Sequence, residues 1–265
     1  LGRLGSQELT LESDLDLVFV YDAPKEVVAS DGAKPLAVSL YYTRLAQRLI
    51  SALTTSTAEG GLFEVDMRLR PSGNKGPVAV AFETFARYHA GEAWTWERMA
   101  LTRARVVLAG ELFRRRVEQA IHEALTQEAI PQQVLKDARE MRDRLAAEFP
   151  GRNRWDLKFA RGGLVDVEFI AQALQLCAAH RDEDVLAAST TAALMRLAAA
   201  GKLASADAQT LISAARMEQA LIQVLRIAVE GTLDPRAATP VLKALLARAA
   251  GTADFATLET YLTDA

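Results

Sequence analysis

Two aspartates, Asp14 and Asp16, stand at the head of an apolar run that ends at Tyr21 and has the composition of a buried β-strand. Side chains two residues apart on a strand point to the same face, so the two carboxylates are expected side by side. Neighbouring carboxylates repel each other unless a cation lies between them, and Mg²⁺ commonly takes one or two carboxylates together with substrate phosphates. The pair therefore suggests a phosphate-handling metal site, but taken alone such a pair is more often a turn capped by aspartates.

A third carboxylate strengthens this interpretation. Apolar and charged residues alternate from Leu62 to Arg70, which predicts a half-buried strand with Asp66 on its polar face. If this strand neighbours the first one, Asp14, Asp16 and Asp66 converge on a space the size of a metal ion. These three aspartates are the predicted catalytic and metal-binding residues.

Basic residues follow the third aspartate directly. Arg68 and Arg70 are expected on the same strand face, and the tight proline-flanked loop after them adds Ser72 and Lys75. Arginines and a lysine in this arrangement suit an anion of several charges beside the metals, such as a triphosphate. The alternative is a solvated strand edge that is protected by its charges.

Three other places carry weaker signals. Trp94 and Trp96 are two residues apart on an expected helix and do not share a face, and core packing is the favoured interpretation for each. Cys177 lies in an apolar helical run, which predicts a buried, inert thiol.

The third place is a glycine pair, Gly162 and Gly163, ahead of a helix that carries Asp166 and Glu168. The backbone N–H groups at such a helix start attract anions. Alternatively, the two acids simply complement the helix dipole, and the sequence leaves both readings open.

The composition sets broad limits. Half of the 265 residues are hydrophobic, which is enough for a substantial core in one large or two ordinary domains. A net charge of −3 argues against a protein that coats nucleic acid, and no apolar stretch reaches the length of a membrane-spanning helix. The single cysteine fits a cytoplasmic location. A functional turn this close to the first residue indicates a fragment of a longer protein, since chain ends normally fray.

The element signals change at Gly110. Before it, the order strand, helix, strand, loop, strand predicts a small mixed α/β unit, in which a helix after Lys34 packs on the sheet through a stripe of leucines. After it, helical periodicity dominates, at 111–126, 132–148, 164–180, 186–200, 205–230, 239–249 and 254–263. The predicted fold class is α+β, with a small mixed β-sheet domain at 1–110 and an all-α helical bundle at 111–265.

Several longer motifs resemble one family. They are Leu4-Gly5-Ser6, Ser13-Asp14-Leu15-Asp16-Leu17, Glu64-Val65-Asp66-Met67-Arg68-Leu69-Arg70-Pro71-Ser72-Gly73, Ala93-Trp94-Thr95-Trp96-Glu97, Arg103-Ala104-Arg105 and Gly162 to Ile170. Over about residues 1 to 180 the chain resembles the bifunctional glutamine synthetase adenylyltransferase and adenylyl-removing enzyme, of the DNA polymerase β-like nucleotidyltransferase superfamily. The Pro-Ser-Gly and Ala-Trp-Thr-Trp-Glu runs are similar to its C-terminal, adenylylating half, whereas Ser6 stands where the family more often has a glycine.

The resemblance implies a nucleotidyltransferase domain that moves AMP from ATP to a tyrosine hydroxyl of glutamine synthetase and releases pyrophosphate. On this basis two Mg²⁺ ions are expected at Asp14, Asp16 and Asp66, in a two-metal mechanism. The expected phosphate-binding residues are Arg68, Arg70, Ser72 and Lys75, together with Gly5 and Ser6, whose backbone amides would approach the phosphates. Asp66, or a bound hydroxide or water, would take the tyrosine proton.

Two other readings stay open. The adenylyl-removing half of the family would use similar acids to move AMP onto phosphate. A non-catalytic regulatory module would instead bind the PII signal protein through its helices. The resemblance also implies PII and glutamine as regulators, with neither nucleic acid nor a membrane as a partner.

Overall fold

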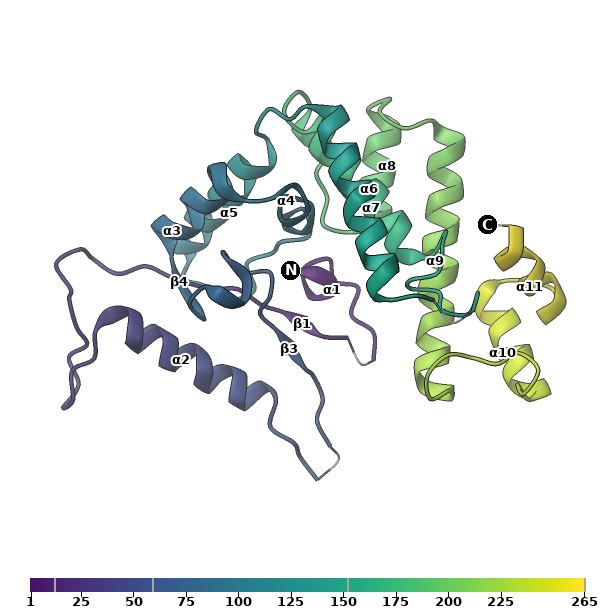
Figure 1. Ribbon diagram of the computed structural model, residues 1–265, viewed down its shortest axis with the longest axis horizontal. Coiled ribbons are helices and arrows are strands. Elements are labelled where there is room, and N and C mark those ends of the chain that lie inside the picture. The colour runs from purple at the N-terminus through teal and green to yellow at the C-terminus, as the bar shows by residue number, and fades with distance from the viewer. Residues whose placement is uncertain (12, 59, 152, 265) are drawn as a thin grey trace. The chain divides into compact units, whose positions relative to one another are not determined.

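A computed structural model describes residues 1–11, 13–58, 60–151 and 153–264, and all candidate site residues lie in these ranges. The chain divides into two compact units, residues 1–128 and 129–265 (Figure 1). The helix α5 (Glu111–Leu125), which follows the expected boundary at Gly110, packs on α3 (Phe82–Arg87) and α4 (Thr95–Leu101) of the first unit. We therefore keep the division into two parts and propose that it falls after this helix.

The first unit combines short strands with helices. In chain order its remaining elements are α1 (Gly2–Gly5), β1 (Leu15–Asp16), β2 (Phe19–Tyr21), α2 (Val38–Leu53), β3 (Val65–Asp66), a 3-10 turn η1 (Gly73–Lys75), β4 (Ala79–Ala81) and a π-helical turn η2 (Tyr88–Glu92). β1 pairs with β3 and β2 pairs with β4, both in parallel. Parallel neighbours need a crossover connection, and α2 lies in the connection from β1 to β3. The mixed α and β character predicted for this part of the chain is confirmed.

The expected strands are shorter than the sequence pattern suggested. The apolar run from Leu15 to Tyr21 forms two strands with different partners, and the stretch from Leu62 to Arg70 is a strand only at Val65–Asp66. The Asp66 carboxylate accepts the backbone N–H of Arg68 at 2.8 Å, a local bond that turns the chain away from the ladder. Alternation of residue types alone did not reveal this turn.

The leucine stripe of α2 does not pack on the sheet as predicted. Leu45 is 51% exposed, Leu40 and Leu49 are also exposed, and Ala46 is the buried residue of this helix. The reason is the size of the partner: α2 packs on β4, a strand of three residues, which is too short to cover a helix of sixteen.

The second unit is helical, as its periodicity predicted. Its elements are α6 (Pro131–Glu148), α7 (Leu164–Ala178), a 3-10 turn η3 (Glu183–Val185), α8 (Thr190–Ala199), α9 (Ser205–Ala228), α10 (Pro240–Ala250) and α11 (Phe255–Asp264). Local chemistry explains several ends: Thr239 caps α10 by accepting the N–H of Leu242 at 3.2 Å, and Gly251 ends it with a positive φ of 71°. The helix boundaries therefore agree with the sequence to within a few residues.

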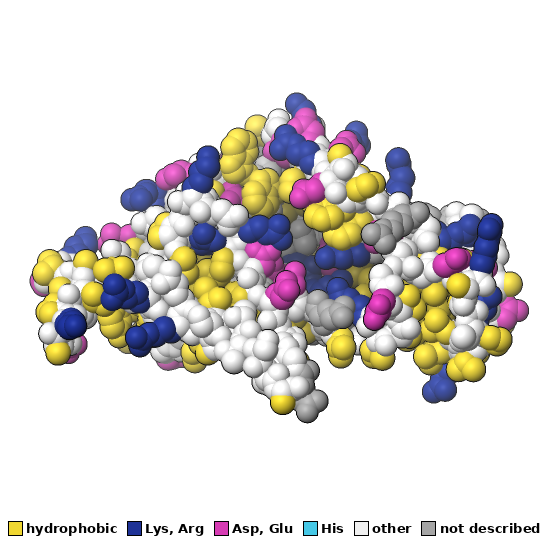
Figure 2. Space-filling model, turned by 60° about the horizontal axis from the view of Figure 1, so that its bottom comes forward, with side chains coloured by type: hydrophobic (Ala, Val, Ile, Leu, Met, Phe, Trp, Pro, Cys, Tyr) yellow, Lys and Arg dark blue, Asp and Glu magenta, His cyan; other side chains and the backbone are white. Residues whose placement is uncertain are grey.

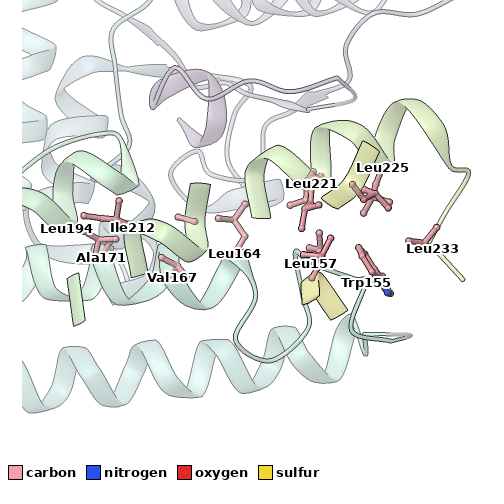
Figure 3. Packing of buried hydrophobic residues seen from close by; sticks show 14 of the residues in the cluster. Trp155, Leu157, Leu164, Val167, Ala171, Leu194, Ile212, Leu221, Leu225 and Leu233 are labelled. Carbon is pink, nitrogen blue, oxygen red and sulfur yellow. The ribbon is translucent and has the colours of Figure 1, made fainter. Parts of the chain in front are cut away.

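The core of this unit joins α7, α8 and α9 with the segment before α7 (Figure 3). Leu164, Leu194 and Leu221 are fully buried in it, and each buried side chain of this kind stabilises the fold by roughly 1.5–3 kcal/mol. Trp155 stacks on Phe255 of α11, with ring centroids 5.3 Å apart. The irregular segment at 153–163 is thus fixed by packing, although it forms no helix.

Charged side chains of both signs are interspersed over the face shown in Figure 2. This distribution matches the small net charge of −3. None of the helices in the described ranges is both long and apolar enough to cross a membrane.

Candidate active site

The candidate site begins with the pairing of β1 and β3. The parallel register sets Asp16 opposite Asp66, and the N–H groups of Leu15 and Leu17 donate to Glu64 O and Asp66 O at 2.8 and 2.9 Å. Residues in register on neighbouring parallel strands have their side chains on the same face. The expected proximity of Asp16 and Asp66 is therefore present in the pairing of the two strands.

Electrostatics also ties these acids together. Burial raises the pKa of Asp16 above its ordinary value, and the negative charges of Asp66 and Asp14 add to the rise. The positive charges of Arg103 and of the amino terminus oppose it. Burial and two neighbouring acids destabilise the charged form of the Asp16 carboxylate, and a bound cation would stabilise that form.

Asp66 is held differently, because Arg68 folds back onto it. The Arg68 side chain donates to Asp66 Oδ2 from Nε at 2.8 Å and from Nη2 at 2.5 Å. Burial by itself raises the pKa of Asp66, but the hydrogen bonds and charge of Arg68 outweigh it and hold that pKa below its ordinary value. The two facing aspartates thus differ in charge balance: one is compensated by an arginine and the other is not.

The carboxylate oxygens of Asp16 and Asp66 are chemically suited to a divalent cation, but one of the two side chains is bonded to an arginine. Among the described residues no group of three His, Cys, Asp or Glu side chains is arranged as a ready metal cage. The engaged side chain is that of Asp66, whose partner Arg68 is itself largely exposed and free to turn outward. Release of this ion pair would leave oxygen donors of the type that Mg²⁺ prefers, from Asp16 and Asp66.

The turn with Gly5 and Ser6 is a buried, tightly bonded structure. Both backbone N–H groups donate within α1, to Leu1 O at 2.8 Å and to Gly2 O at 3.1 Å. Two distant arginines hold the turn from outside: Arg103 Nη2 donates to Ser6 Oγ at 2.7 Å, and Arg105 Nε donates to Gly5 O at 3.2 Å. The amides expected at the phosphates are thus occupied within the turn.

Glycine is required in this turn because other backbone lies against it. A Cβ on Gly5 would fall 1.8 Å from Arg103 O, and one on Gly2 would fall 1.8 Å from Asp16 Oδ2. Gly2 also has a positive φ of 48°. Gly2 was not predicted, since a single glycine near the start of the sequence carries no signal of its own.

We expect Gly5→Ala to destabilise the chain by about 1–3 kcal/mol or more, because the new methyl group collides with backbone that cannot move aside cheaply. Urea unfolding measures the change. Gly91→Ala is the matched control, since a Cβ there meets no atom within 4 Å. Equal stability of the two variants would contradict this account of the turn.

The basic residues after Asp66 lie in different settings. Arg70 is only 7% exposed and donates to Met67 O at 2.7 Å and to Gly76 O at 3.3 Å, so it closes the loop from inside. Ser72 is exposed in a left-handed conformation with φ 63°, and Lys75 is exposed without a partner among the described residues. Arg68 and Lys75 are therefore the exposed basic side chains of this segment, and Arg70 shapes the loop that carries Lys75.

A second polar cluster was not foreseen in the sequence. Tyr88 donates to both carboxylate oxygens of Glu97, at 2.9 and 2.8 Å, and Glu97 also accepts the N–H of Trp94 at 2.8 Å. Burial and this carboxylate raise the pKa of Tyr88 to about 12. The position of Glu97 three residues after Trp94, which directly precedes α4, was the available signal, since it is the position of a capping acid. Trp94 itself is 70% exposed, so core packing is wrong for this residue.

The glycine pair in the second unit has a structural role in this conformation. Gly162 has a φ of 79°, and a Cβ on Gly163 would fall 2.6 Å from Leu157 O. The N–H of Gly162 donates to Asp166 Oδ2 at 2.7 Å, and that carboxylate is ion-paired with Arg142. These contacts favour the second of the two interpretations for Asp166, in which this acid satisfies the N-terminus of the helix and no anion is bound there.

Comparison with known proteins gives the class of the molecule. The family model for glutamate-ammonia ligase adenylyltransferase matches residues 1–120, which contain the β1–β3 pair and its aspartates. A second model, described as GlnD PII-uridylyltransferase, matches residues 136–259. The chain thus combines sequence features of two kinds of nucleotidyl-transferring enzyme.

Comparison with curated relatives indicates one particular kind of enzyme within this class. Enzymes named bifunctional glutamine synthetase adenylyltransferase/adenylyl-removing enzyme are 47% identical in Bradyrhizobium diazoefficiens and in Rhodopseudomonas palustris, over 98% of this chain and 26% of each relative. The corresponding enzyme of Xanthobacter autotrophicus is 45% identical over the whole chain and 27% of its own length. The chain belongs to this family, and it spans about a quarter of the length of the curated relatives it matches.

Proposed function

We propose that the first unit transfers AMP from ATP to a tyrosine hydroxyl of glutamine synthetase and releases pyrophosphate, as part of the adenylylating half of its family. The carrying observation is the strand register that pairs Asp16 with Asp66, next to Arg68. Family membership and the names of the relatives support the reaction and its protein substrate.

The roles of the residues follow from their settings. Asp14, Asp16 and Asp66 would hold two Mg²⁺ ions, which would supply positive charge to the triphosphate and to the attacking hydroxyl. Arg68 leaves Asp66 and, with Lys75 and Ser72, contacts the departing pyrophosphate. Arg70 keeps their loop closed, while the turn at Gly5 and Ser6 backs the first strand. Asp66 or a bound water takes the tyrosine proton.

Regulation is assigned to the helical unit. The family model that matches residues 136–259 names PII in its description, which supports the PII signal protein as a regulator, with glutamine as a second effector. The substrate and the single cysteine suit a cytoplasmic location. The half-buried Cys177, whose pKa is raised by burial, takes no part in this chemistry.

The test incubates the chain with Mg²⁺, ATP labelled at the α-phosphate, and glutamine synthetase. Label on the synthetase and release of pyrophosphate are expected. A parallel reaction supplies adenylylated synthetase and phosphate, and production of ADP there without labelling in the first would favour the adenylyl-removing reading. If neither reaction proceeds and Mg²⁺ with ATP leaves the melting temperature unchanged, the chain is a regulatory module, since a ligand stabilises the state that binds it.

A further inference from the structure

The second unit contains a pocket whose lining includes none of the residues assigned above to nucleotidyl transfer. It has a volume of about 900 Å³ and lies between α6, α7 and the segment that connects them. Pockets that bind small molecules commonly measure about 300–1,000 Å³. Its lining residues recur three or four apart on both helices, so the pocket follows the groove between two packed helices over several turns.

The apolar part of the lining is open to solvent. Phe149 and Phe159 stack with ring centroids 4.8 Å apart and an interplanar angle of 15°, and Phe149 is 41% exposed. Ile170 of α7 is 39% exposed in the same pocket. Exposed aromatic faces of this kind offer an aromatic ligand both burial and offset stacking.

The polar part of the lining is positively charged, in a chain whose net charge is negative. Four arginines and two aspartates line the pocket. Arg142 is ion-paired with Asp166, and Arg154 donates to Glu259 O and to Thr263 Oγ1. The remaining arginines, Arg139 and Arg161, are exposed and have no hydrogen-bond or ion-pair partner in the part of the chain that the structure describes.

These free arginines outnumber the remaining acid of the lining, Asp143. A guanidinium group binds planar or tetrahedral anionic groups through paired N–H donors, which a lysine does not match. Two such groups beside a stacked phenylalanine pair provide both halves of a site for an amphipathic anion.

We propose that this pocket binds a small aromatic anion, with its ring against Phe149 and Phe159 and its acidic group at Arg139 and Arg161. All of its lining residues belong to the second unit, and the site does not depend on the proposed transfer of AMP. A volume suited to a molecule of drug size, rather than a long flat face, is what favours a small ligand over a partner helix.

The test measures binding of 8-anilinonaphthalene-1-sulfonate, an aromatic sulfonate, to the 265-residue chain by fluorescence titration. N-phenyl-1-naphthylamine, which lacks the sulfonate, is the matched neutral probe. We expect saturable binding of one sulfonate per chain, about tenfold or more tighter than the neutral probe, because a charge-assisted contact is lost without the acidic group.

Variants connect the binding to the pocket. Arg139→Ala and Arg161→Ala are each expected to weaken sulfonate binding at least fivefold and to leave the neutral probe unaffected. Arg144→Ala is the control, since Arg144 is exposed on the same helix but does not line the pocket. Ile170→Trp fills the pocket and is expected to remove binding of both probes, with circular dichroism verifying that each variant is folded.

Equal affinity for the two probes would overturn the proposal and indicate a purely apolar groove, as a partner helix requires. Sulfonate binding that is unchanged in Arg139→Ala and Arg161→Ala, or equally weakened in Arg144→Ala, would overturn it as well. The same holds for the absence of saturable binding to the folded wild-type chain.

Discussion

Asp16→Asn is expected to lower the rate of ATP-dependent labelling of glutamine synthetase by about a hundredfold or more, since even indirect damage to a metal site costs roughly 10–100-fold. Asp16 faces Asp66 across the β1–β3 pair, and its pKa is raised because burial and the charges of Asp66 and Asp14 outweigh the positive charges near it. Asparagine keeps the shape of the side chain and removes the charge that would hold a metal. Initial rates at saturating Mg²⁺ and ATP give the comparison.

Stability distinguishes this result from a folding defect. Removal of a half-buried negative charge near Asp14 and Asp66 relieves repulsion, so the variant is expected to melt at the same or a higher temperature than the wild type. Asp31→Asn, at an exposed position of the same unit, is the control and should keep full activity. Activity of Asp16→Asn within about tenfold of the wild type would show that the carboxylate is no metal ligand.

The second large effect concerns Glu218 in the middle of α9. This residue is 5% exposed, and its Oε2 has no hydrogen-bond partner among the described residues. Burial raises its pKa to about 8, and the charges of Asp166 and Glu168 on α7 add to that rise. Glu218 is therefore protonated in the folded chain at neutral pH, whereas an unfolded chain has already lost that proton.

The sign of the pH dependence follows. Below the unfolded pKa, near 4.5, both states carry the proton and the group has no effect on stability. Between that value and about 8 the unfolded state binds fewer protons, so the free energy of unfolding falls as the pH rises. Since one pKa unit corresponds to about 1.4 kcal/mol, the loss across this window amounts to a few kcal/mol.

Glu218→Gln is expected to remove this fall, and to be more stable than the wild type by a few kcal/mol at pH 9. Urea unfolding of both chains at pH 5, 7 and 9 measures it. Glu230→Gln, at an exposed acid just after the same helix, should follow the wild-type curve. Parallel pH curves for the wild type and Glu218→Gln would mean that Glu218 ionises in the folded chain like an ordinary surface acid.

Residue types in the sequence indicate which side chains could take part in chemistry, but not which of those side chains bond to each other. Asp66 and Arg68 were both assigned to the candidate site, and the contact between them was invisible because alternation placed them as separate side chains on one long strand face. In the structure the short Asp66 side chain captures the backbone and side chain of Arg68 and ends the strand. A local hydrogen bond thus overrides a periodic pattern that extends over nine residues.

Burial of charge was equally hidden. Arg70 and Arg68 are both arginines of the same alternating segment, yet Arg70 is buried inside a loop whereas Arg68 is exposed. The reason is that the carbonyl groups that accept from Arg70 are brought into position only when the loop has formed. The helices of the second unit were easier to predict, since their apolar residues repeat at short range and their ends carry residues such as Pro240 and Gly251. Periodic apolar patterns and the residues at helix ends were therefore predictable, whereas the hydrogen bonds that particular side chains form were not.

The clamp of Arg103 and Arg105 on the first turn has a consequence for the order in which the chain folds. Arg103 donates to Ser6 across a separation of 97 residues, and β1 can pair only with β3, which follows fifty residues later in the chain. Contacts this far apart form only after long loops have closed, which makes them slow and late. During synthesis Asp14 and Asp16 emerge before Arg103 and Arg105, and their surroundings are complete only when these arginines have followed, so the site is among the last parts of the first unit to take shape.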